Sequence, residues 1–311
     1  MDKDALAANP DYSRYYPEMA GGICPRTRNL GRMKTCFVAG CGFTGLATAR
    51  LLYGRGWTVI GGTHSAESAA ILAGEAFPVV ACDITDRAAL ARLPAIETVV
   101  HCASSGRGGV EQYRTVYLEG ARALAETLAP QRFVFTSSTS VYAQADGSVV
   151  TEDNAAEPDR ETGRVLREAE EIVLANGGSV ARLAGIYGPG RSILLKKFFS
   201  GEAIIEGDGR RFINQVHRDD IASALVLLIE SGARGVFNVC DDEPMTQRAV
   251  YEWLAQYFQQ PLPPTGPPDP NRKRGWTSKR VSNAKLRALG WTPRFPTFFD
   301  AIQNDPTLPA P

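Results

Sequence analysis

TCFVAGCGFTG, residues 35–45, is the stretch of sequence that decides the fold of this chain. It begins with an apolar run typical of a buried parallel strand, turns through glycines and continues as a helix-like run to Leu52. A strand, turn and helix in this order let the backbone approach the pyrophosphate of a dinucleotide, which the free N–H groups and dipole of the helix attract. We predict a dinucleotide site with contacts from Gly40, Gly42, Phe43, Thr44 and Gly45.

Length and composition exclude several classes of protein. The 311 residues suffice for one large α/β unit or two domains, and 44% hydrophobic residues can fill a sizeable core. The 34 basic and 34 acidic residues balance without a basic stripe, which favours small-molecule partners over nucleic acid. The six cysteines form no C-x-x-C pair, so a reduced, cytoplasmic compartment is expected. The longest apolar run, Ile221 to Ile229, is too short for a membrane span, and no metal site is predicted.

Short β-branched runs alternate with helical stretches over the first two thirds of the chain. Strands are predicted at 57–60, 77–81, 98–102, 132–136 and 179–184, and helices near 110–128 and 160–175. This alternation predicts βαβ units, and hence a Rossmann-type, doubly wound parallel sheet of the α/β class with a smaller C-terminal substrate lobe. Ligands in such sheets bind at the carboxyl ends of the strands.

The domain organisation follows from this pattern. Residues 33–185 are predicted to form the NAD(P)-binding Rossmann domain. Residues 186–311 are predicted to form mainly the substrate lobe, with about 216–240 returning to the first domain. Residues 1–32 mix Pro, Gly, Tyr and charge without periodicity, so we interpret them as a poorly ordered extension, and Met33 could be the biological start.

The strand ends supply further candidate contacts to the cofactor. An acidic residue about 20 positions beyond the glycines usually binds the ribose of NAD, but Thr63, His64 and Ser65 occupy that region. No Arg is present there to clamp a phosphate, so the prediction of NADP over NAD rests on the missing carboxylate alone. Asp83 either accepts from the adenine amine or caps a helix that starts near Thr85. The candidates at the strand ends are Thr63, His64, Asp83, Ile84, Ala103, Ser104 and Tyr187.

Five landmarks in this order resemble the extended short-chain dehydrogenase/reductase family, the NAD-dependent epimerases and dehydratases, across nearly all of residues 33–305. They are VAGCGFTG (38–45), CDI (82–84), FTSSTSVY (135–142), LAGIYGPG (183–190) and SNAKLRALGWTP (282–293). The family's G-x-x-G-x-x-G pattern maps onto Ala39, Gly42 and Gly45, with Ala in place of the first glycine. The resemblance implies an NAD(P) site and a homodimer formed through the helices at 110–128 and 160–175.

The family's catalytic pair is absent from this chain. The resemblance implies a Ser or Thr, which Ser138 matches, followed by Tyr-x-x-x-Lys on the next helix. Thr162 stands at the expected Tyr and Leu166 at the expected Lys. No shift of register restores the pair, because no Tyr lies between positions 142 and 187 and no Lys between positions 34 and 196.

Substitute proton donors are therefore considered. Tyr142 follows the Ser138 strand exit, Tyr187 follows the next one, and His217 has an imidazole suited to proton transfer near neutral pH. Each of these residues has an alternative, non-catalytic role: packing for Tyr142, lining the cofactor pocket for Tyr187 and a hydrogen bond within the lobe interface for His217. Thr162 alone is too weak an acid. The catalytic candidates are Ser138, Tyr142 and Thr162.

Two further departures from the family's pattern narrow the range of expected substrates. The Asp-Glu pair of the dehydratases is replaced by Thr139 and Ser140, so elimination of water is not expected. The Arg that grips a nucleotide diphosphate in the sugar enzymes is replaced by Ile213. Candidate substrate contacts are Arg191, Arg211, Asn214 and His217.

The sequence predicts an NAD(P)-dependent oxidoreductase or epimerase that acts on a hydroxyl or carbonyl group of a small, polar, sugar-like metabolite. The alternative is a non-catalytic NAD(P)-binding sensor or regulatory module, which the missing pair would allow.

Overall fold

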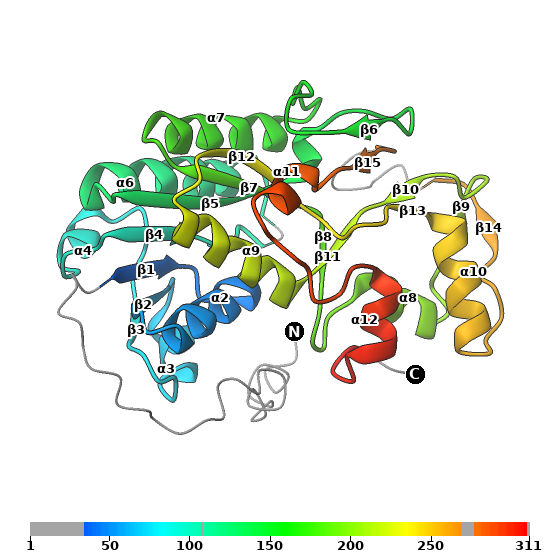
Figure 1. Ribbon diagram of the computed structural model, residues 1–311, viewed down its shortest axis with the longest axis horizontal. Coiled ribbons are helices and arrows are strands. Elements are labelled where there is room, and N and C mark those ends of the chain that lie inside the picture. Colours follow the sequence, from blue (N-terminus) through cyan, green and yellow to red (C-terminus); the bar gives the residue numbers. More distant parts are fainter. Residues whose placement is uncertain (1–33, 107, 269–276, 310–311) are drawn as a thin grey trace.

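The computed structural model describes residues 34–106, 108–268 and 277–309 (Figure 1). The interpretation of residues 1–32 as an extension and of Met33 as a start concerns residues outside these ranges. Among the described residues, none of the helices has both the length and the apolar character that a membrane crossing requires.

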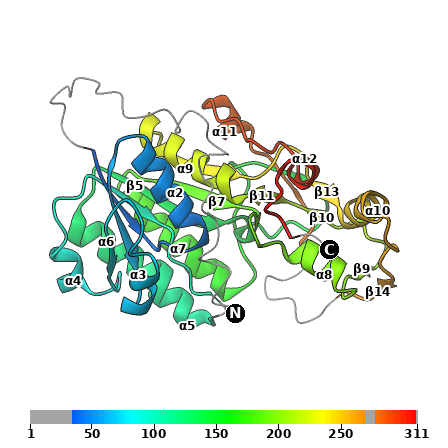
Figure 2. The ribbon, with the colours of Figure 1, turned by 90° about the horizontal axis from the view of Figure 1, so that it is seen from below.

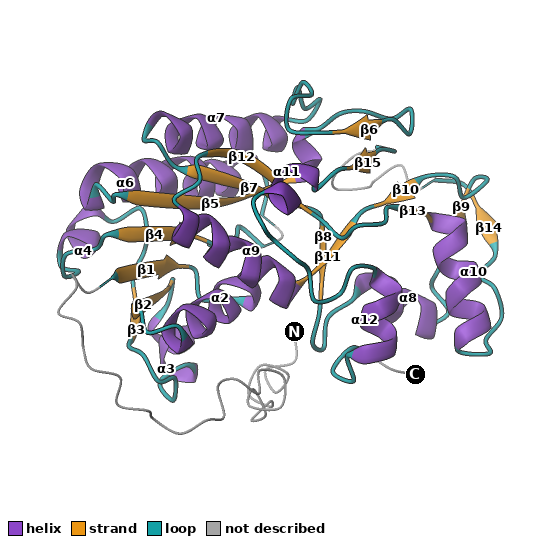
Figure 3. Ribbon diagram, viewed as in Figure 1, coloured by secondary structure: helices purple, strands orange, loops and turns teal. Residues whose placement is uncertain are grey.

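A parallel sheet of seven strands forms the centre of the molecule (Figure 3). The strand order is β12-β7-β5-β4-β1-β2-β3, and every neighbouring pair is parallel. The order reverses beside β1, between β1 and β4, which is where ligands bind in such sheets. The predicted Rossmann-type α/β fold is confirmed. The strands are β1 (Thr35–Ala39), β2 (Thr58–Thr63), β3 (Val79–Ala81), β4 (Thr98–His101), β5 (Arg132–Ser138), β7 (Ser179–Leu183) and β12 (Gly235–Val239).

Helices cover both faces of the sheet (Figure 2). On one face α2 (Phe43–Gly54) packs on α9 (Arg218–Ser231), whose middle is the apolar run from Ile221 to Ile229. On the other face lie α6 (Gly120–Leu128) and α7 (Glu161–Ala175). Two apolar cores result, one on each side of the sheet. The shorter helices are α3 (Ala66–Ile71), α4 (Arg87–Ala91), α5 (Val110–Tyr113), the π-helical η3 (Arg114–Glu119) and the 3-10 turn η4 (Thr139–Val141).

The strand predicted at residues 57–60 extends further than the sequence indicated. β2 continues through Gly61 and Gly62 to Thr63, whereas the sequence predicted a strand that ends at Ile60. The reason is long-range packing, because a Cβ atom at Gly62 would lie 2.6 Å from Cζ of Phe37 on β1. The glycines make room for this aromatic ring inside the sheet.

The smaller lobe is built from short elements around its own apolar core, which includes Tyr187, Phe198 and Phe298. Its helices are α8 (Ile193–Phe199), α10 (Gln247–Tyr257) and α12 (Phe298–Asn304). Its paired strands are β8 (Gly185–Tyr187) with β11 (Gln215–His217), β10 (Phe212–Ile213) with β13 (Met245–Thr246), and β9 (Ile205–Glu206) with β14 (Thr265–Gly266). β15 (Arg280–Val281) pairs with β6 (Val149–Val150) ahead of α11 (Ala284–Ala288).

Candidate functional site

The glycines after β1 differ in what they do. Gly40 has a positive φ of 97°, and a Cβ atom there would lie 2.4 Å from Cα of Ala103. A Cβ atom at Gly45 would lie 2.1 Å from the carbonyl oxygen of Gly40. At Gly42, by contrast, a Cβ atom would meet no atom of the described residues within 4 Å. Gly40 and Gly45 therefore allow the tight turn, and Gly42 leaves the space in front of it open.

The N-terminus of α2 opens onto this space. Gly42 is its N-cap residue, no side chain from the described part of the chain caps the helix, and its first turn contains no acidic residue. The first helical hydrogen bond runs from the N–H of Leu46 to the carbonyl of Gly42 at 2.9 Å. The preceding N–H groups have no acceptor within the helix, so they are available to an anion. These residues fit the pyrophosphate of a dinucleotide.

The exit of β4 borders the same turn, and β3 ends two strands away from β1 at the same edge of the sheet. Ala103 touches Gly40, and the next residue, Ser104, is exposed. Asp83 is exposed and accepts hydrogen bonds from the N–H (2.9 Å) and hydroxyl (2.8 Å) of Thr85, and the N–H bond contributes most to lowering its pKa. Ile84 is buried. The alternative that Asp83 caps a helix is wrong, because α4 starts two residues later than predicted and Asp86 caps it.

The exit of β2 presents a different surface from that of an NAD site with an acidic residue. Thr63 is buried, and its hydroxyl donates to the carbonyl of Ser65 at 3.2 Å, so it faces the protein interior. His64 is exposed. Ser65 caps α3 by accepting from the N–H of Ser68 at 3.2 Å. Of the polar side chains at this exit, the imidazole of His64 is the one that faces solvent.

Thiol chemistry at the glycine turn is disfavoured. All five described cysteines are free. Burial raises the pKa of both Cys41 and Cys102, which flank the turn, to about 12. Near neutral pH these thiols stay protonated and act as small apolar side chains.

Ser138 lies where the sequence placed it, at the end of β5. It is partly buried, and its Oγ accepts from the N–H of Ser140 at 3.2 Å, which leaves the hydroxyl proton available to another acceptor. Thr162 and Leu166 lie on the first turns of α7, Thr162 partly exposed and Leu166 buried.

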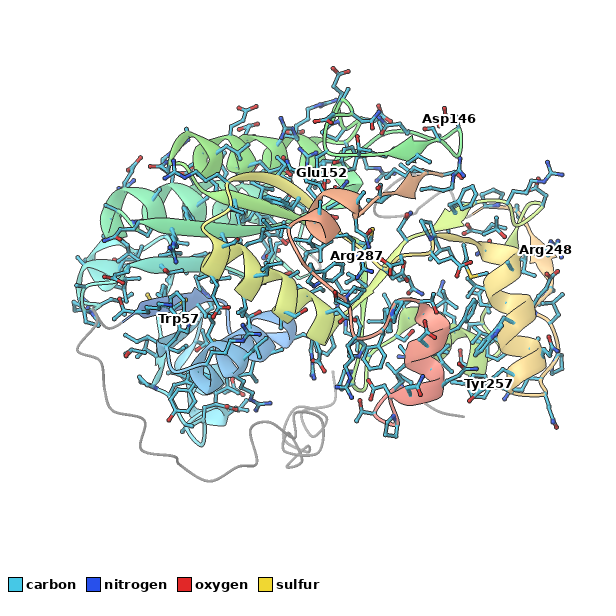
Figure 4. All side chains as sticks on the ribbon, viewed as in Figure 1. Trp57, Asp146, Glu152, Arg248, Tyr257 and Arg287 are labelled. Atoms are coloured by element: carbon cyan, nitrogen blue, oxygen red, sulfur yellow. The ribbon has the colours of Figure 1, made fainter. Side chains whose placement is uncertain are left out.

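Tyr142 is placed in the interior. Its side chain is fully buried, and its hydroxyl donates to Oδ1 of Asn238 on β12 at 2.9 Å. The N–H of Asn238 in turn donates to Oε1 of Glu152 at 2.7 Å (Glu152 is labelled in Figure 4). Burial raises the pKa of Tyr142. This placement argues against Tyr142 as the proton donor.

Tyr187 is also buried, in the core of the lobe, where its ring contacts Phe298 and His217 at centroid distances of 4.9 and 5.3 Å. Burial raises the pKa of its phenol well above the usual range, and the carboxylates of Asp241 and Asp220 add to this. Within the described residues its hydroxyl has no hydrogen-bond partner. A packing role suits Tyr187 better than cofactor binding or proton transfer.

The four predicted substrate contacts do not act as one set. His217 is buried and caps α9: its Nδ1 accepts from the N–H of Asp219 (3.2 Å), and its Nε2 donates to Asp305 (3.0 Å). Asn214 holds the segment before β15, through the carbonyl of Lys279 (2.9 Å) and the N–H of Val281 (2.7 Å). Arg211 lies 3.4 Å from the carboxylate of Glu206. Only the fourth, Arg191, reaches the dinucleotide turn.

Arg191 and Arg218 bring positive charge to the start of α2. Their guanidinium carbons lie 5.0 and 5.2 Å from the ring centroid of Phe43, the first residue of that helix. Arg218 also pairs with Asp219 at 2.8 Å. Arg191 from the lobe and Arg218 from the start of α9 thus place cationic side chains beside the N-terminus of α2.

Comparison with known proteins identifies the family of this chain. A model of the NAD dependent epimerase/dehydratase family matches residues 36–240. The chain belongs to this family.

Relatives of this NAD-dependent epimerase/dehydratase family member span most of its length. Protein YeeZ of Escherichia coli strain K12 is 31% identical over 239 residues, which is 72% of this chain and 84% of that protein. The 3-diazoavenalumate denitrifying reductase of a Streptomyces species is 28% identical over 213 residues, 60% of this chain and 68% of that one. A structure from Methylobacillus flagellatus, assigned to the NAD-dependent epimerases and dehydratases, superposes with a TM-score of 0.73 at 26% identity, covering 88% and 97% of the two chains.

Two residues near these strand exits were missed by the sequence analysis. Tyr117 lies in the π-helical segment η3, and its hydroxyl lies 3.4 Å from Oγ of Ser104. The signal that could have found it is the pair of tyrosines four residues apart, Tyr113 and Tyr117, which share one helix face. The second missed residue is Lys279, a buried lysine whose Nζ donates to the carbonyl of Tyr142 at 2.8 Å. No sequence signal marks it.

Lys279 makes stability depend on pH in a way that can be measured. Burial lowers its pKa from 10.5 to about 8, and within the described part of the chain it makes no ion pair. Between these two values the unfolded chain binds more protons than the folded one, so the free energy of unfolding rises with pH in that window, by at most about 3 kcal/mol. Urea denaturation at about pH 7.5 and pH 10 should show this rise in the wild type, and Lys279→Met should lack it. An equal rise in the free energy of unfolding of both proteins would show that Lys279 does not cause the pH dependence.

Proposed function

We propose that this protein is an NAD(P)-dependent oxidoreductase or epimerase that acts on a hydroxyl or carbonyl group of a small, polar, sugar-like metabolite. The observation that carries the proposal is the open space at Gly42 in front of an uncapped helix N-terminus, with Ser138 at a strand exit of the same sheet edge. The bound nucleotide would supply or accept a hydride. Ser138 would donate its hydroxyl proton to the substrate oxygen in a hydrogen bond.

The proposal includes a preference for NADP over NAD. It is supported by the exit of β2, where exposed His64 stands in place of a carboxylate and the next acidic side chain is Glu67, inside α3. A carboxylate at this position would accept from the ribose hydroxyls of NAD and repel the extra phosphate of NADP.

The test is a titration of the purified protein with NADPH and with NADH, followed by cofactor fluorescence. We expect both to bind and NADPH to bind more tightly. A panel of aldehydes, ketones and reducing sugars should then reveal one that consumes the reduced cofactor. If neither nucleotide binds, the proposed function is wrong.

The sensor alternative keeps one specific observation in its favour. Thr162 and Leu166 stand where the family has its acid and its lysine, and Leu166 is buried, so it cannot act at the cofactor. Tight nucleotide binding without turnover of any carbonyl would favour a sensor. Turnover of any member of the panel would exclude it.

A further inference from the structure

Tyr117 owes its position to an irregularity in the helix after β4. Residues 114–119 form a π-helical segment between α5 and α6, a feature that is frequent at functional sites. The carbonyl of Val116, within this segment, accepts a hydrogen bond from Nε2 of His101 at 3.1 Å. His101 is the last residue of β4 and is fully buried, and burial lowers its pKa to about 4. The neutral imidazole fastens the π-helical segment to the end of β4.

The hydroxyl of Tyr117 consequently lies at the exit of β4. It is 3.4 Å from Oγ of Ser104, an exposed residue that directly follows the contact between Ala103 and Gly40. His101 pairs with Phe135 in the sheet, and Ser104 and Ser138 each lie three residues beyond this pair. The Tyr117 ring also packs against Phe135 at a centroid distance of 6.2 Å. The phenol therefore lies at the exit of β4, beside the dinucleotide turn, and β4 is the sheet neighbour of β5, the strand that ends at Ser138.

The same segment borders the helix that lacks the expected acid. Arg114, the first residue of η3, lies 3.9 Å from Glu161 and 3.5 Å from Glu168, both on α7. Thr162, which stands at the expected Tyr position, follows Glu161 directly. The η3 segment packs against α7 and carries a phenol, that of Tyr117, which α7 lacks.

We propose that Tyr117 is the catalytic acid–base residue of this protein, taking the place of the missing tyrosine at Thr162. The inference rests on the proposed function. In the reducing direction, a hydride from the reduced nicotinamide adds to the carbonyl carbon and the C=O π electrons move to oxygen. The oxygen takes the hydroxyl proton of Tyr117, and water reprotonates the phenolate through Ser104. In the oxidising direction, the phenolate of Tyr117 accepts the proton of the substrate hydroxyl while the hydride passes from the substrate carbon to the oxidised nicotinamide.

One arm of the test needs no substrate. The affinities of NAD⁺ and NADH are measured from about pH 7 to about pH 10, where tyrosines lose their protons. A phenolate beside the nicotinamide attracts the cationic ring of NAD⁺ and not the neutral ring of NADH. In the wild type the affinity for NAD⁺ relative to NADH should rise about 10-fold over this range, and in Tyr117→Phe it should stay flat. Tyr53→Phe, on the far end of α2, is the matched control and should rise like the wild type.

The second arm uses a carbonyl found in the panel. Tyr117→Phe should lower kcat by about 100-fold or more while KM and the Kd of NADH change by less than about threefold. A pH-dependent NAD⁺ affinity that persists in Tyr117→Phe, or an unchanged kcat, would overturn the inference. Absence of nucleotide binding in the wild type would instead overturn the proposed function, so the two failures are distinguishable.

Discussion

Gly42→Asp should abolish dinucleotide binding while leaving the fold intact. The backbone at Gly42 is extended, with φ −88°, and a Cβ atom there meets none of the described atoms within 4 Å, so the new side chain fits without strain. Its carboxylate would lie where the pyrophosphate is expected and would repel it. Like charges a few ångströms apart near a protein surface cost about 3 kcal/mol or more, so the Kd of NADPH should rise about 100-fold or more.

A stability measurement separates a direct effect on NADPH binding from an effect on the fold. Asp is among the preferred N-cap residues, so Gly42→Asp should unfold at the same urea concentration as the wild type or a higher one. Gly74→Asp is the matched control, because Gly74 is also exposed with nothing within 4 Å, yet it lies after α3, outside the proposed site. It should bind NADPH like the wild type. Normal NADPH binding by Gly42→Asp would refute the location of the site.

Gly45 provides the opposite case. A methyl group there would overlap the carbonyl of Gly40 at 2.1 Å, and that atom belongs to the backbone, so it cannot move aside cheaply. Substitution at Gly45 should therefore act through the fold, whereas substitution at Gly42 should act through the ligand. The sequence motif alone treats the two glycines alike.

The parts of the site that the sequence predicted are those fixed by local spacing. The glycine turn, α2 and Ser138 at the end of β5 follow from short patterns, and the structure places them at one edge of the sheet. Positions that depend on distant partners were not predictable in the same way. The partner of the Tyr142 hydroxyl, Asn238, is 96 residues away in sequence, and the packing of Phe37 on Gly62 joins two strands.

Tyr117 escaped the sequence analysis for a related reason. Its position depends on a π-helical segment, which the pattern of apolar residues in the sequence does not predict. It also depends on the hydrogen bond from His101 that holds this segment against β4. The substitute acids that the sequence suggested, Tyr142, Tyr187 and His217, all follow Ser138, as the family's tyrosine does. Only the three-dimensional contact with Ser104 brings the helix after β4 into consideration.

Glu170→Gln should lower the free energy of unfolding by about 3–5 kcal/mol. The Glu170 carboxylate is fully buried on α7 and accepts hydrogen bonds from Ser137 (2.6 Å), from Nε and Nη2 of Arg182 (3.0 and 2.7 Å) and from Arg167. Arg182 on β7 is itself buried, and its guanidinium lies over the ring of Tyr142 at 4.8 Å. Gln keeps the volume of Glu and removes the charge, so the Arg182 cation is left buried and uncompensated.

Two variants separate the charge from the packing. Glu171→Gln removes a carboxylate from the next position of α7, where the side chain is 70% exposed and lies 3.9 Å from Arg167. The free energy of unfolding should therefore change by about 0.5 kcal/mol or less. The double variant Glu170→Leu with Arg182→Leu removes both charges and should recover part of the stability that Glu170→Gln loses. Urea denaturation of the four proteins checks both statements, and a cost below about 1 kcal/mol for Glu170→Gln would contradict the role of the pair.

The Glu170 pair also links stability to the site. Ser137, whose hydroxyl donates to Glu170, directly precedes Ser138 at the end of β5. Gln has one acceptor oxygen where Glu170 has two, so Ser137 and Arg182 compete for it and the strand end is held less firmly. NADPH turnover by Glu170→Gln should therefore fall even at temperatures where the variant is folded, while Glu171→Gln keeps wild-type turnover. Equal turnover in the folded states would mean that the network holds the core together without positioning Ser138.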